Sequence, residues 1–351
     1  MDEAVSAALR ANGYLSDVFT RREEYEPLFL DGLGRFRFFA SQQRAPFDPV
    51  VSRFLFERGA FPAFPSRRRY AICLSHDIDA LHFNRYRGGG SGLLSRARRG
   101  AARSAELLLS RSLKRGDPEW NLERIADIEE ERGARSAFFC LALEEGEKDF
   151  YFRVQEVGAQ LRSLVARGWE VGLHGGHEAY CDPAALRREK VRLEAELGSP
   201  VTGFRAHYLR FDVPATWRLL AEAGFRYDTT FGYADCAGFR NGMCHPYTPF
   251  DRNADRSIPI LEVPLVVMDT TLQLYMRLDP ADAWTAIRRL LDAVAECSGV
   301  LTVLWHPQNM NGAWGDLYLR ILDHGTDTDA WLTGPGELAG WWLSQQAGGN
   351  A

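Results

Sequence analysis

The 351-residue sequence has no apolar run of about eighteen residues, the length that a membrane-spanning helix requires. Its first residues also lack the positively charged segment and the following apolar segment of a secretory signal peptide. We therefore expect no transmembrane segment and a cytoplasmic location.

Cysteine is sparse and scattered. The six cysteines lie far apart in the chain, and no two of them have the Cys-x-x-Cys spacing that thiolate metal sites use. This scatter argues against a thiolate zinc site and against a small disulfide scaffold. We expect the thiols to be reduced.

Basic residues are fewer than acidic ones, and the formal net charge of -5 leaves the chain without a general attraction for nucleic acid. Lysine occurs only at positions 114, 148 and 190, so arginine supplies almost all of the positive charge. This usage indicates a GC-rich genome rather than a particular chemistry. Nucleic acid is not an expected partner.

Positive charge is concentrated in residues 83–116, which contain nine basic residues and one acid, Glu106. After the glycines at 88–90, leucine and alanine recur at helical spacing with arginines between them, which predicts a basic amphipathic helix. Two interpretations stay open. The helix either packs its apolar face on the rest of the protein, or forms a surface that meets an anionic substrate or a membrane face.

Six short runs of apolar or β-branched residues predict strands, and five longer patterns between them predict helices. The strands are expected at 70–75, 136–142, 169–173, 201–205, 261–268 and 300–305, and the helices at 121–132, 152–167, 183–197, 214–223 and 280–297. This alternation indicates an α/β fold with a parallel sheet, either open or closed into a barrel. Residues 1–69 lack the repeat and are rich in aromatic residues, so we expect them to form an N-terminal layer on the sheet.

Side chains with metal-binding chemistry follow the first and third predicted strands. Asp77 and Asp79 stand two residues apart where the first strand ends, and paired carboxylates are unfavourable unless a cation or a proton separates them. His174, His177 and Glu178 follow the third strand. If a helix begins there, these three share one face and suit Zn²⁺ or a similar divalent ion. Because metals collect ligands from several strands, the two clusters together favour a metal site.

Two later strands end in groups that suit proton transfer. Arg205, His207 and Tyr208 follow the fourth strand, and an arginine beside a carboxylate lowers the pKa of that carboxylate and fixes its orientation. His306 follows the last strand, where a histidine can titrate near neutral pH and protonate a leaving amine. A salt bridge for Arg205 and a core position for His306 are the structural alternatives.

In this order, the motifs SHDID, LHGGHE, FRAHY and VLWH resemble those of the polysaccharide deacetylase family, also called the NodB-homology family. The sequence outside these motifs also resembles a bacterial branch of this family that has an added N-terminal region. The resemblance implies an α/β fold, a distorted (β/α) barrel of about seven strands. This NodB-like barrel would cover residues 70–347 with a basic helical insertion at 83–116, and residues 1–69 would be an N-terminal extension that packs on it.

The resemblance also implies the ligands of a divalent metal ion, zinc in the first instance. Asp79 matches the metal-binding aspartate of the family, and His174 matches its first histidine ligand. The family's second histidine falls four residues later, where this sequence has Glu178, with His177 just before it. A carboxylate suits Zn²⁺ or a harder ion, whereas His177 would require a small shift of the helix start. We favour Glu178 as the third ligand and keep His177 as the alternative.

The groups that move protons are implied in the same way. Asp77 matches the catalytic base, Arg205 the arginine that pairs with it, and His306 the catalytic acid. Tyr208 matches the tyrosine whose backbone N–H helps to hold the oxyanion. Asp228 is our candidate for the carboxylate that orients the acid.

These roles predict a metal-dependent hydrolase that removes an N-acyl group, acetyl in the first instance, from an amino sugar or saccharide intermediate. We expect the saccharide inside the cell. An anionic or lipid-linked substrate is one option. A peripheral membrane contact through residues 83–116 is a further option. Two alternatives stay open. One is hydrolysis of another C–N bond, such as a formamide on a lipid-linked sugar or a cyclic ureide. The other is a lapsed, non-catalytic barrel that binds a glycan or a partner protein.

Overall fold

Nine strands form one parallel sheet within residues 3–81 and 122–348, the part of the chain that the computed structural model describes. Hydrogen-bonded neighbours follow the order β8-β5-β4-β3-β2-β1-β10-β9, and β11 also pairs with β1. The strands are β1 (Ala71–Ile78), β2 (Ala137–Leu141), β3 (Glu170–Gly175), β4 (Gly203–Ala206), β5 (Tyr227–Asp228), β8 (Leu261–Glu262), β9 (Val267–Met268), β10 (Val300–Leu304) and β11 (Trp331–Thr333). A separate antiparallel hairpin joins β6 (Phe250–Asp251) to β7 (Arg256–Ser257).

One segment, Leu261–Met268, closes the sheet into a barrel. Its start, β8, pairs with β5 and its end, β9, pairs with β10, so both edges of the sheet belong to the same stretch of chain. Pro264 lies between these short strands and has no N–H to donate to a ladder. The sequence predicted a single strand over 261–268, and the structure divides it into two. The predicted barrel is confirmed: eight strands follow one another in the hydrogen-bonded path, β8 and β9 belong to one segment, and β11 lies off this path beside β1.

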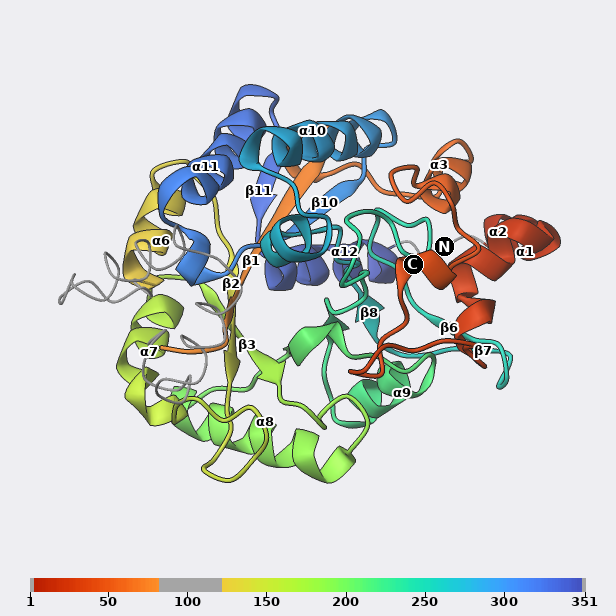
Figure 1. Cartoon of the computed structure of the whole chain (residues 1–351). Coiled ribbons are helices and arrows are strands. Elements are labelled where there is room, and N and C mark those ends of the chain that lie inside the picture. The colour runs from red at the N-terminus through yellow and green to blue at the C-terminus, as the bar shows by residue number, and fades with distance from the viewer. Residues whose placement is uncertain (1–2, 82–121, 349–351) are drawn as a thin grey trace, which may run out of the picture.

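Helices surround the barrel (Figure 1). The α-helices of the described residues are α1 (Glu3–Ala11), α2 (Gly13–Thr20), α3 (Val50–Phe56), α6 (Leu122–Glu130), α7 (Gly158–Ala166), α8 (Pro183–Leu197), α9 (Ala215–Glu222), α10 (Pro280–Glu296), α11 (Gly312–Asp327) and α12 (Pro335–Gly348). Single tighter or wider turns are η1 (Arg22–Glu24), η2 (Phe38–Ala40), η3 (Pro65–Arg67), η4 (Val154–Glu156), η5 (His207–Leu209), η6 (Thr271–Tyr275) and η7 (Pro307–Asn309). α8 has the predicted bounds because Asp182 caps its first turn, accepting from the Ala184 N–H.

The sequence missed several elements. β5 and β11 contain two and three residues, too few for a periodic pattern to show. The missed helix α12 places Leu338 and Trp342 in one buried cluster with Ala71 and Val300, the first residues of β1 and β10. It therefore covers the end of the barrel where the strands begin.

The sequence also predicted a basic helical insertion and no transmembrane segment. The basic helix predicted at 83–116 lies outside the described residues. Within 3–81 and 122–348, no helix is both long enough and apolar enough to span a membrane.

The N-terminal segment, residues 3–69, packs against side chains of the barrel. Phe19 of α2 meets Tyr247 edge-on, with ring centroids 5.3 Å apart. Val51 and Leu55 of α3 belong to the same buried apolar cluster. Figure 1 shows α1, α2 and α3 together on one flank of the molecule. These contacts fit an N-terminal layer, and the domain boundary at residue 69 stays a prediction.

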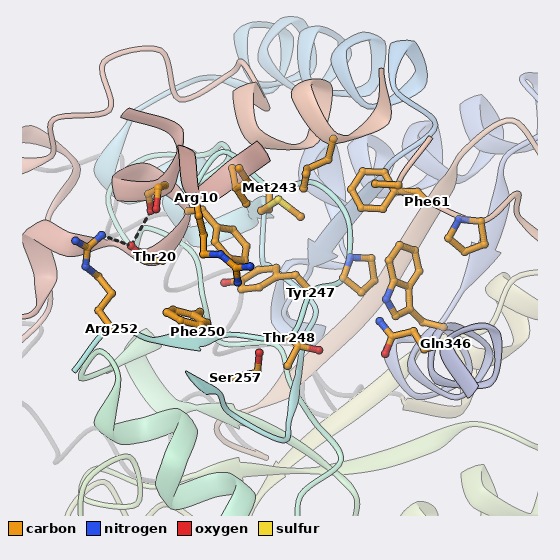
Figure 2. Close-up of a pocket in the computed structure, with 18 of the residues that line it drawn as sticks. Arg10, Thr20, Phe61, Met243, Tyr247, Thr248, Phe250, Arg252, Ser257 and Gln346 are labelled. Atoms are coloured by element: carbon orange, nitrogen blue, oxygen red, sulfur yellow. Dashed lines mark hydrogen bonds between the residues drawn. The ribbon is translucent and has the colours of Figure 1, made fainter. Parts of the chain in front are cut away.

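A cavity of about 940 Å³ lies between the N-terminal segment, the loop before β8 and α12 (Figure 2). Phe61, Tyr247 and Trp342 are among the side chains that line it. Phe61 and Trp342 also pack beside Ala71, where β1 begins. The cavity therefore lies at the end of the barrel opposite the carboxyl ends of the strands.

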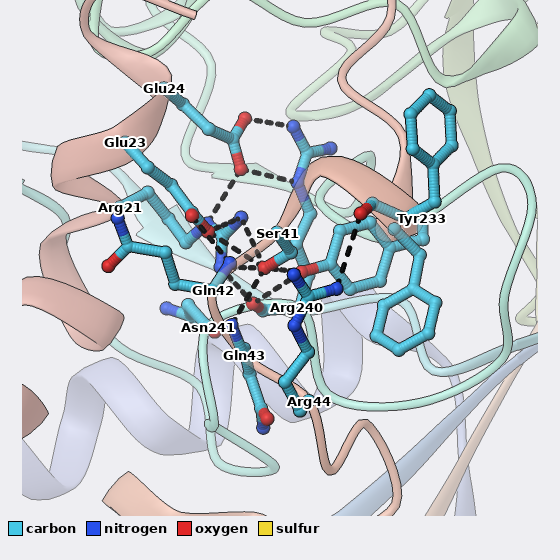
Figure 3. A network of polar contacts seen from close by, with 12 residues as sticks. Arg21, Glu23, Glu24, Ser41, Gln42, Gln43, Arg44, Tyr233, Arg240 and Asn241 are labelled. Carbon is cyan, nitrogen blue, oxygen red and sulfur yellow. Dashed lines mark hydrogen bonds and ion pairs between the residues drawn. The ribbon is translucent and has the colours of Figure 1, made fainter. Parts of the chain in front are cut away.

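A buried ionic network joins the N-terminal segment to the loop after β5 (Figure 3). Glu24 accepts hydrogen bonds from Arg21 Nε (2.6 Å) and Arg240 Nε (3.0 Å), and Arg21 Nη1 donates to the Arg240 carbonyl (2.7 Å). All three residues are buried. Burial alone would raise the pKa of Glu24, but the charges of Arg240 and Arg21 outweigh it and lower that pKa. The network therefore depends on a Glu24 carboxylate that stays ionised.

Glu24→Gln should lower the free energy of unfolding by about 3 to 5 kcal/mol, because it removes the carboxylate that pairs with buried Arg240 and leaves buried Arg21 with Glu23 as its remaining partner. Chemical denaturation followed by circular dichroism measures this change. Glu26→Gln replaces an exposed glutamate two residues away and should have little effect. Equal stability of the two variants would contradict a stabilising role for the network.

Candidate active site

The polar groups singled out in the sequence gather at the carboxyl ends of β1, β3, β4 and β10. Asp77 lies near the end of β1 and Asp79 follows it, while His174 lies at the end of β3. Arg205 is in β4, and His306 follows β10. Because all these strands run in parallel, their ends meet at one mouth of the barrel.

Asp79 lies among three imidazoles. Its carboxylate oxygens are 3.1 Å from His174 Nε2, 3.5 Å from His306 Nε2 and 4.0 Å from His207 Nε2. Burial alone would raise the pKa of Asp79, but the neighbouring histidines outweigh it and lower that pKa. The carboxylate is therefore held ionised in a mostly enclosed position.

The contact between Asp79 and His174 indicates that a cation fits between them. His174 Nδ1 lies 3.1 Å from the Arg205 carbonyl and can only donate to it. In neutral His174 the other nitrogen, Nε2, is then an acceptor that faces the acceptor Oδ1 of Asp79. This oxygen is buried and has no hydrogen-bond partner among the described residues. A proton or a metal ion would relieve the repulsion.

Asp79, His174 and His207 could hold a metal ion, since one ligand atom from each lies within 4.8 Å of the others. Two imidazole nitrogens and one carboxylate oxygen are a donor set that suits Zn²⁺. Burial lowers the pKa of His207 to about 4, which keeps this imidazole in the neutral form that binds metals. These three residues, called the metal group below, fit a divalent ion.

The structure brings His207, rather than Glu178 or His177, to the other two members of the metal group. The Glu178 side chain is 54% exposed. His177 uses both ring nitrogens elsewhere, with Nδ1 2.8 Å from Asp149 Oδ2 and Nε2 2.7 Å from Lys148 Nζ. His207 therefore replaces Glu178 and His177 as the third residue beside Asp79 and His174. The binding of a metal ion by these residues stays a proposal.

The local backbone explains this correction. The prediction required a helix to begin directly after β3, so that His174, His177 and Glu178 would share one face. The chain instead forms a turn there, and α8 begins only at Pro183. The sequence position of His207 also indicates a site residue, because it directly follows a strand end as the other polar groups of the site do.

Arg205 holds Asp77 in place. The guanidinium is completely buried, and its Nη1 donates to Asp77 Oδ1 at 3.1 Å. Its remaining nitrogens donate to Ser75 Oγ (2.9 Å) and to the Thr229 carbonyl (3.1 Å). Asp77 Oδ2 stays 3.7 Å from His174 Nε2. One carboxylate oxygen is thus fixed by arginine while the other faces the metal group.

Asp269, and not Asp228, holds the candidate acid His306. Asp269 Oδ1 lies 2.6 Å from His306 Nδ1, and Oδ2 accepts the His306 backbone N–H at 2.8 Å. Burial alone would lower the pKa of His306, but the charge and hydrogen bond of Asp269, with the charge of Asp79, raise it to about 10. The sequence contained a signal for Asp269, an acid directly after the strand predicted at 261–268.

Asp228 in β5 is completely buried. Its Oδ1 accepts from Thr230 Oγ1 at 2.6 Å, and burial raises the pKa of both Asp228 and its neighbour Glu262. Trp217 Nε1 donates to Glu262 at 2.7 Å. These contacts give Asp228 a structural place, so the prediction that it orients His306 is wrong.

Tyr208 has a left-handed backbone, with φ of 61°, and Leu209 after it has φ of 56°. Such values are uncommon for residues other than glycine and recur at functional sites. Arg35 from the N-terminal segment donates to the Tyr208 carbonyl at 3.1 Å and so helps to hold this turn. The oxyanion role of the Tyr208 N–H stays a prediction.

The turn after β3 rests on Glu189 of α8. This carboxyl is 2% exposed, and its Oε2 accepts the Gly176 N–H at 2.7 Å. A Cβ at Gly176 would lie 2.6 Å from Leu143 Cδ2, so a larger residue here would require the Leu143 side chain to shift. Burial raises the pKa of Glu189 to about 7. The turn therefore carries a carboxyl group that is costly to ionise.

The identity of the third ligand can be tested by metal affinity. His207→Gln should weaken Zn²⁺ binding by more than about 100-fold, since removal of a ligand costs more than removal of a group that only supports one. Glu178→Gln should bind Zn²⁺ as the wild type does. Titration against a chromophoric chelator measures both constants, and the reverse pattern would restore Glu178 as the ligand.

Glu189 predicts a pH dependence of stability. The folded-state pKa of about 7 exceeds the ordinary glutamate value of 4.5, so the folded protein binds the proton more tightly than the unfolded chain. Stability should therefore be greatest below pH 4.5 as far as this group is concerned, and fall as the pH rises through 7. Glu189→Gln should remove this loss, on the order of 3 kcal/mol. Urea denaturation at several pH values checks it, and parallel pH profiles for both proteins would contradict it.

No protein-family model and no curated protein matches the sequence. Among solved structures, a putative polysaccharide deacetylase from Mycobacterium smegmatis is similar at 21% identity and a TM-score of 0.55, over 81% of this chain and 94% of that one. The peptidoglycan deacetylase PdaC from Bacillus subtilis aligns at 14% identity and a TM-score of 0.41, over 81% of this chain and 96% of that one.

A pseudoenzyme of the CE4 family from Bacillus anthracis aligns at 14% identity and a TM-score of 0.38, over 62% of this chain and 60% of that one. The likeness to the mycobacterial structure extends over most of both chains. The chain therefore has the fold of the polysaccharide deacetylases.

Proposed function

We propose that this protein hydrolyses an N-acyl amide, acetyl in the first instance, on an amino sugar or saccharide intermediate. The observation that carries the proposal is the placement of two separately supported proton carriers beside one metal group. Asp77 is fixed by Arg205, and His306 is fixed by Asp269. Both face Asp79 or its partner His174.

The metal group suggests the electrophilic part of the reaction. A divalent ion bound by Asp79, His174 and His207, for which we propose Zn²⁺, would polarise the acyl carbonyl and lower the pKa of a water molecule. The buried acceptor oxygen of Asp79 and the neutral His207 ring support this assignment.

Asp77 would act as the general base. Its Oδ1 is occupied by Arg205 Nη1, which leaves Oδ2 beside the metal group to accept a proton from the attacking water. Arg205 is completely buried and cannot move away without breaking its bonds to Ser75 and Thr229. The base is thus held in one orientation.

His306 would act as the general acid. Its Nδ1 faces Asp269, so Nε2 is the nitrogen that faces the site, 3.5 Å from Asp79 Oδ2. A proton on Nε2 can pass to the departing amide nitrogen, which then leaves as an amine. The Tyr208 N–H is our proposed additional donor to the oxyanion.

Asp77→Asn should lower kcat for an N-acetylated sugar by about 10²- to 10⁴-fold, because the amide keeps the shape of the base without its proton affinity. Mass-spectrometric detection of released acetate, over a panel of N-acetylated sugars and sugar nucleotides, provides the measurement. Asp323→Asn on the exposed face of α11 is the matched control and should keep full activity.

Three results would contradict the proposed hydrolysis. One is full turnover by Asp77→Asn, and another is turnover that a chelator leaves unchanged. The third is purified protein without stoichiometric metal and without turnover of any N-acyl sugar, which would favour the lapsed, non-catalytic barrel.

A further inference from the structure

A second polar cluster lies behind His207, on the side away from Asp79. It consists of Lys148, Asp149, His177 and Tyr208, from the loop after β2, the turn after β3 and the turn after β4. Asp149 Oδ2 is 2.8 Å from His177 Nδ1, and Tyr208 donates its hydroxyl to Asp149 Oδ1 at 3.4 Å. The proposed chemistry assigns no task to Lys148, Asp149 or His177.

His207 connects this cluster to the metal group. Its Nε2 faces Asp79 Oδ1 at 4.0 Å, and its Nδ1 faces Asp149 Oδ2 at 3.8 Å. That Nδ1 is buried and has no hydrogen-bond partner in the described part of the chain. The other two imidazoles at the site have their Nδ1 atoms engaged, His174 by the Arg205 carbonyl and His306 by Asp269.

The missing partner of His207 follows from metal-site chemistry. A histidine that gives one nitrogen to a metal donates the N–H of the other, commonly to a carboxylate, which fixes the ring and raises its basicity. Asp149 is the carboxylate that faces this nitrogen. The distance of 3.8 Å is longer than a hydrogen bond by about 1 Å.

The protonation of His177 shows how Asp149 is held. The Lys148 ammonium can only donate, so His177 Nε2, 2.7 Å from Lys148 Nζ, must accept. The His177 proton is then on Nδ1 and is donated to Asp149. Asp149 has a left-handed backbone with φ of 66°, and its loop is tied to α8 by an ion pair of 2.6 Å between Glu147 and Arg192.

We propose that Asp149 is a positioning residue for the metal ligand His207, and that His177 acts on the metal through Asp149; this inference rests on the metal group of the proposed function. The histidine at position 177 would then support the site from one residue further out instead of binding the ion itself. His207 from the turn after β4 takes the place among the ligands.

The test is a metal titration of the full chain with Zn²⁺ against a chromophoric chelator, repeated with Co²⁺ so that the visible spectrum reports ligand geometry. Asp149→Asn and His177→Gln should each weaken binding by about 10- to 100-fold and shift the Co²⁺ spectrum. Glu145→Gln, in the same loop and exposed, is the matched control and should match the wild type. The double variant should bind no more weakly than Asp149→Asn alone, because His177 acts through Asp149.

Wild-type affinity in Asp149→Asn would overturn the proposal, and so would complete loss of binding, which would make Asp149 a ligand. If the affinity losses of the two single variants add up in the double variant, His177 does not act through Asp149.

Thermal unfolding of the metal-free proteins shows whether each variant folds. If His177→Gln does not fold, Tyr208→Phe removes only the hydroxyl contact to Asp149 and should give a smaller loss of affinity. A chain that shows the expected affinities without hydrolysing N-acyl sugars would contradict the proposed function alone.

Discussion

Enclosure of the Asp79 carboxylate, whose Oδ1 is buried although the side chain is 25% exposed, is the constraint on which the rest of the site depends. A carboxylate taken out of water is unfavourable unless positive charge or a cation compensates it. Here His174 and His306 lie beside the carboxylate from two different strand ends, and neutral His207 approaches it from a third as a proposed metal ligand. Such convergence requires parallel strands that finish at one mouth, and the barrel supplies them.

The segment that closes the barrel also positions the candidate acid. Leu261–Met268 supplies both edges of the sheet, and the next residue is Asp269. Asp269 accepts from the ring and the backbone of His306 and from Asn309 Nδ2. The orientation of His306 is thus coupled to the closure of the sheet, because the same backbone determines both.

The N-terminal segment contributes to the mouth of the barrel as well as to its flank. Arg35 donates to the Tyr208 carbonyl, and Arg210, two residues after Tyr208, donates to the Leu33 carbonyl at 2.8 Å. These two bonds run in opposite directions between the segment and the turn after β4. They brace the left-handed backbone of Tyr208 and Leu209, which stands beside the proposed ligand His207.

The sequence by itself determined the barrel and most of the groups at its mouth. Asp77, Asp79, His174, Arg205 and His306 were found because each ends a strand whose apolar pattern is local, and parallel strands end together. The helix expected directly after β3 was wrong, since a turn follows this strand and α8 begins only at Pro183.

Only the tertiary structure decided which histidine joins Asp79 and His174, and which carboxylate supports His306. His207 and Asp269 lie far along the chain from the groups that they approach. A strand end is specified by neighbours in sequence, whereas the distance between two loops depends on the twist, register and closure of the whole sheet. That is why the residues at the mouth could be named from the sequence, while their pairing could not.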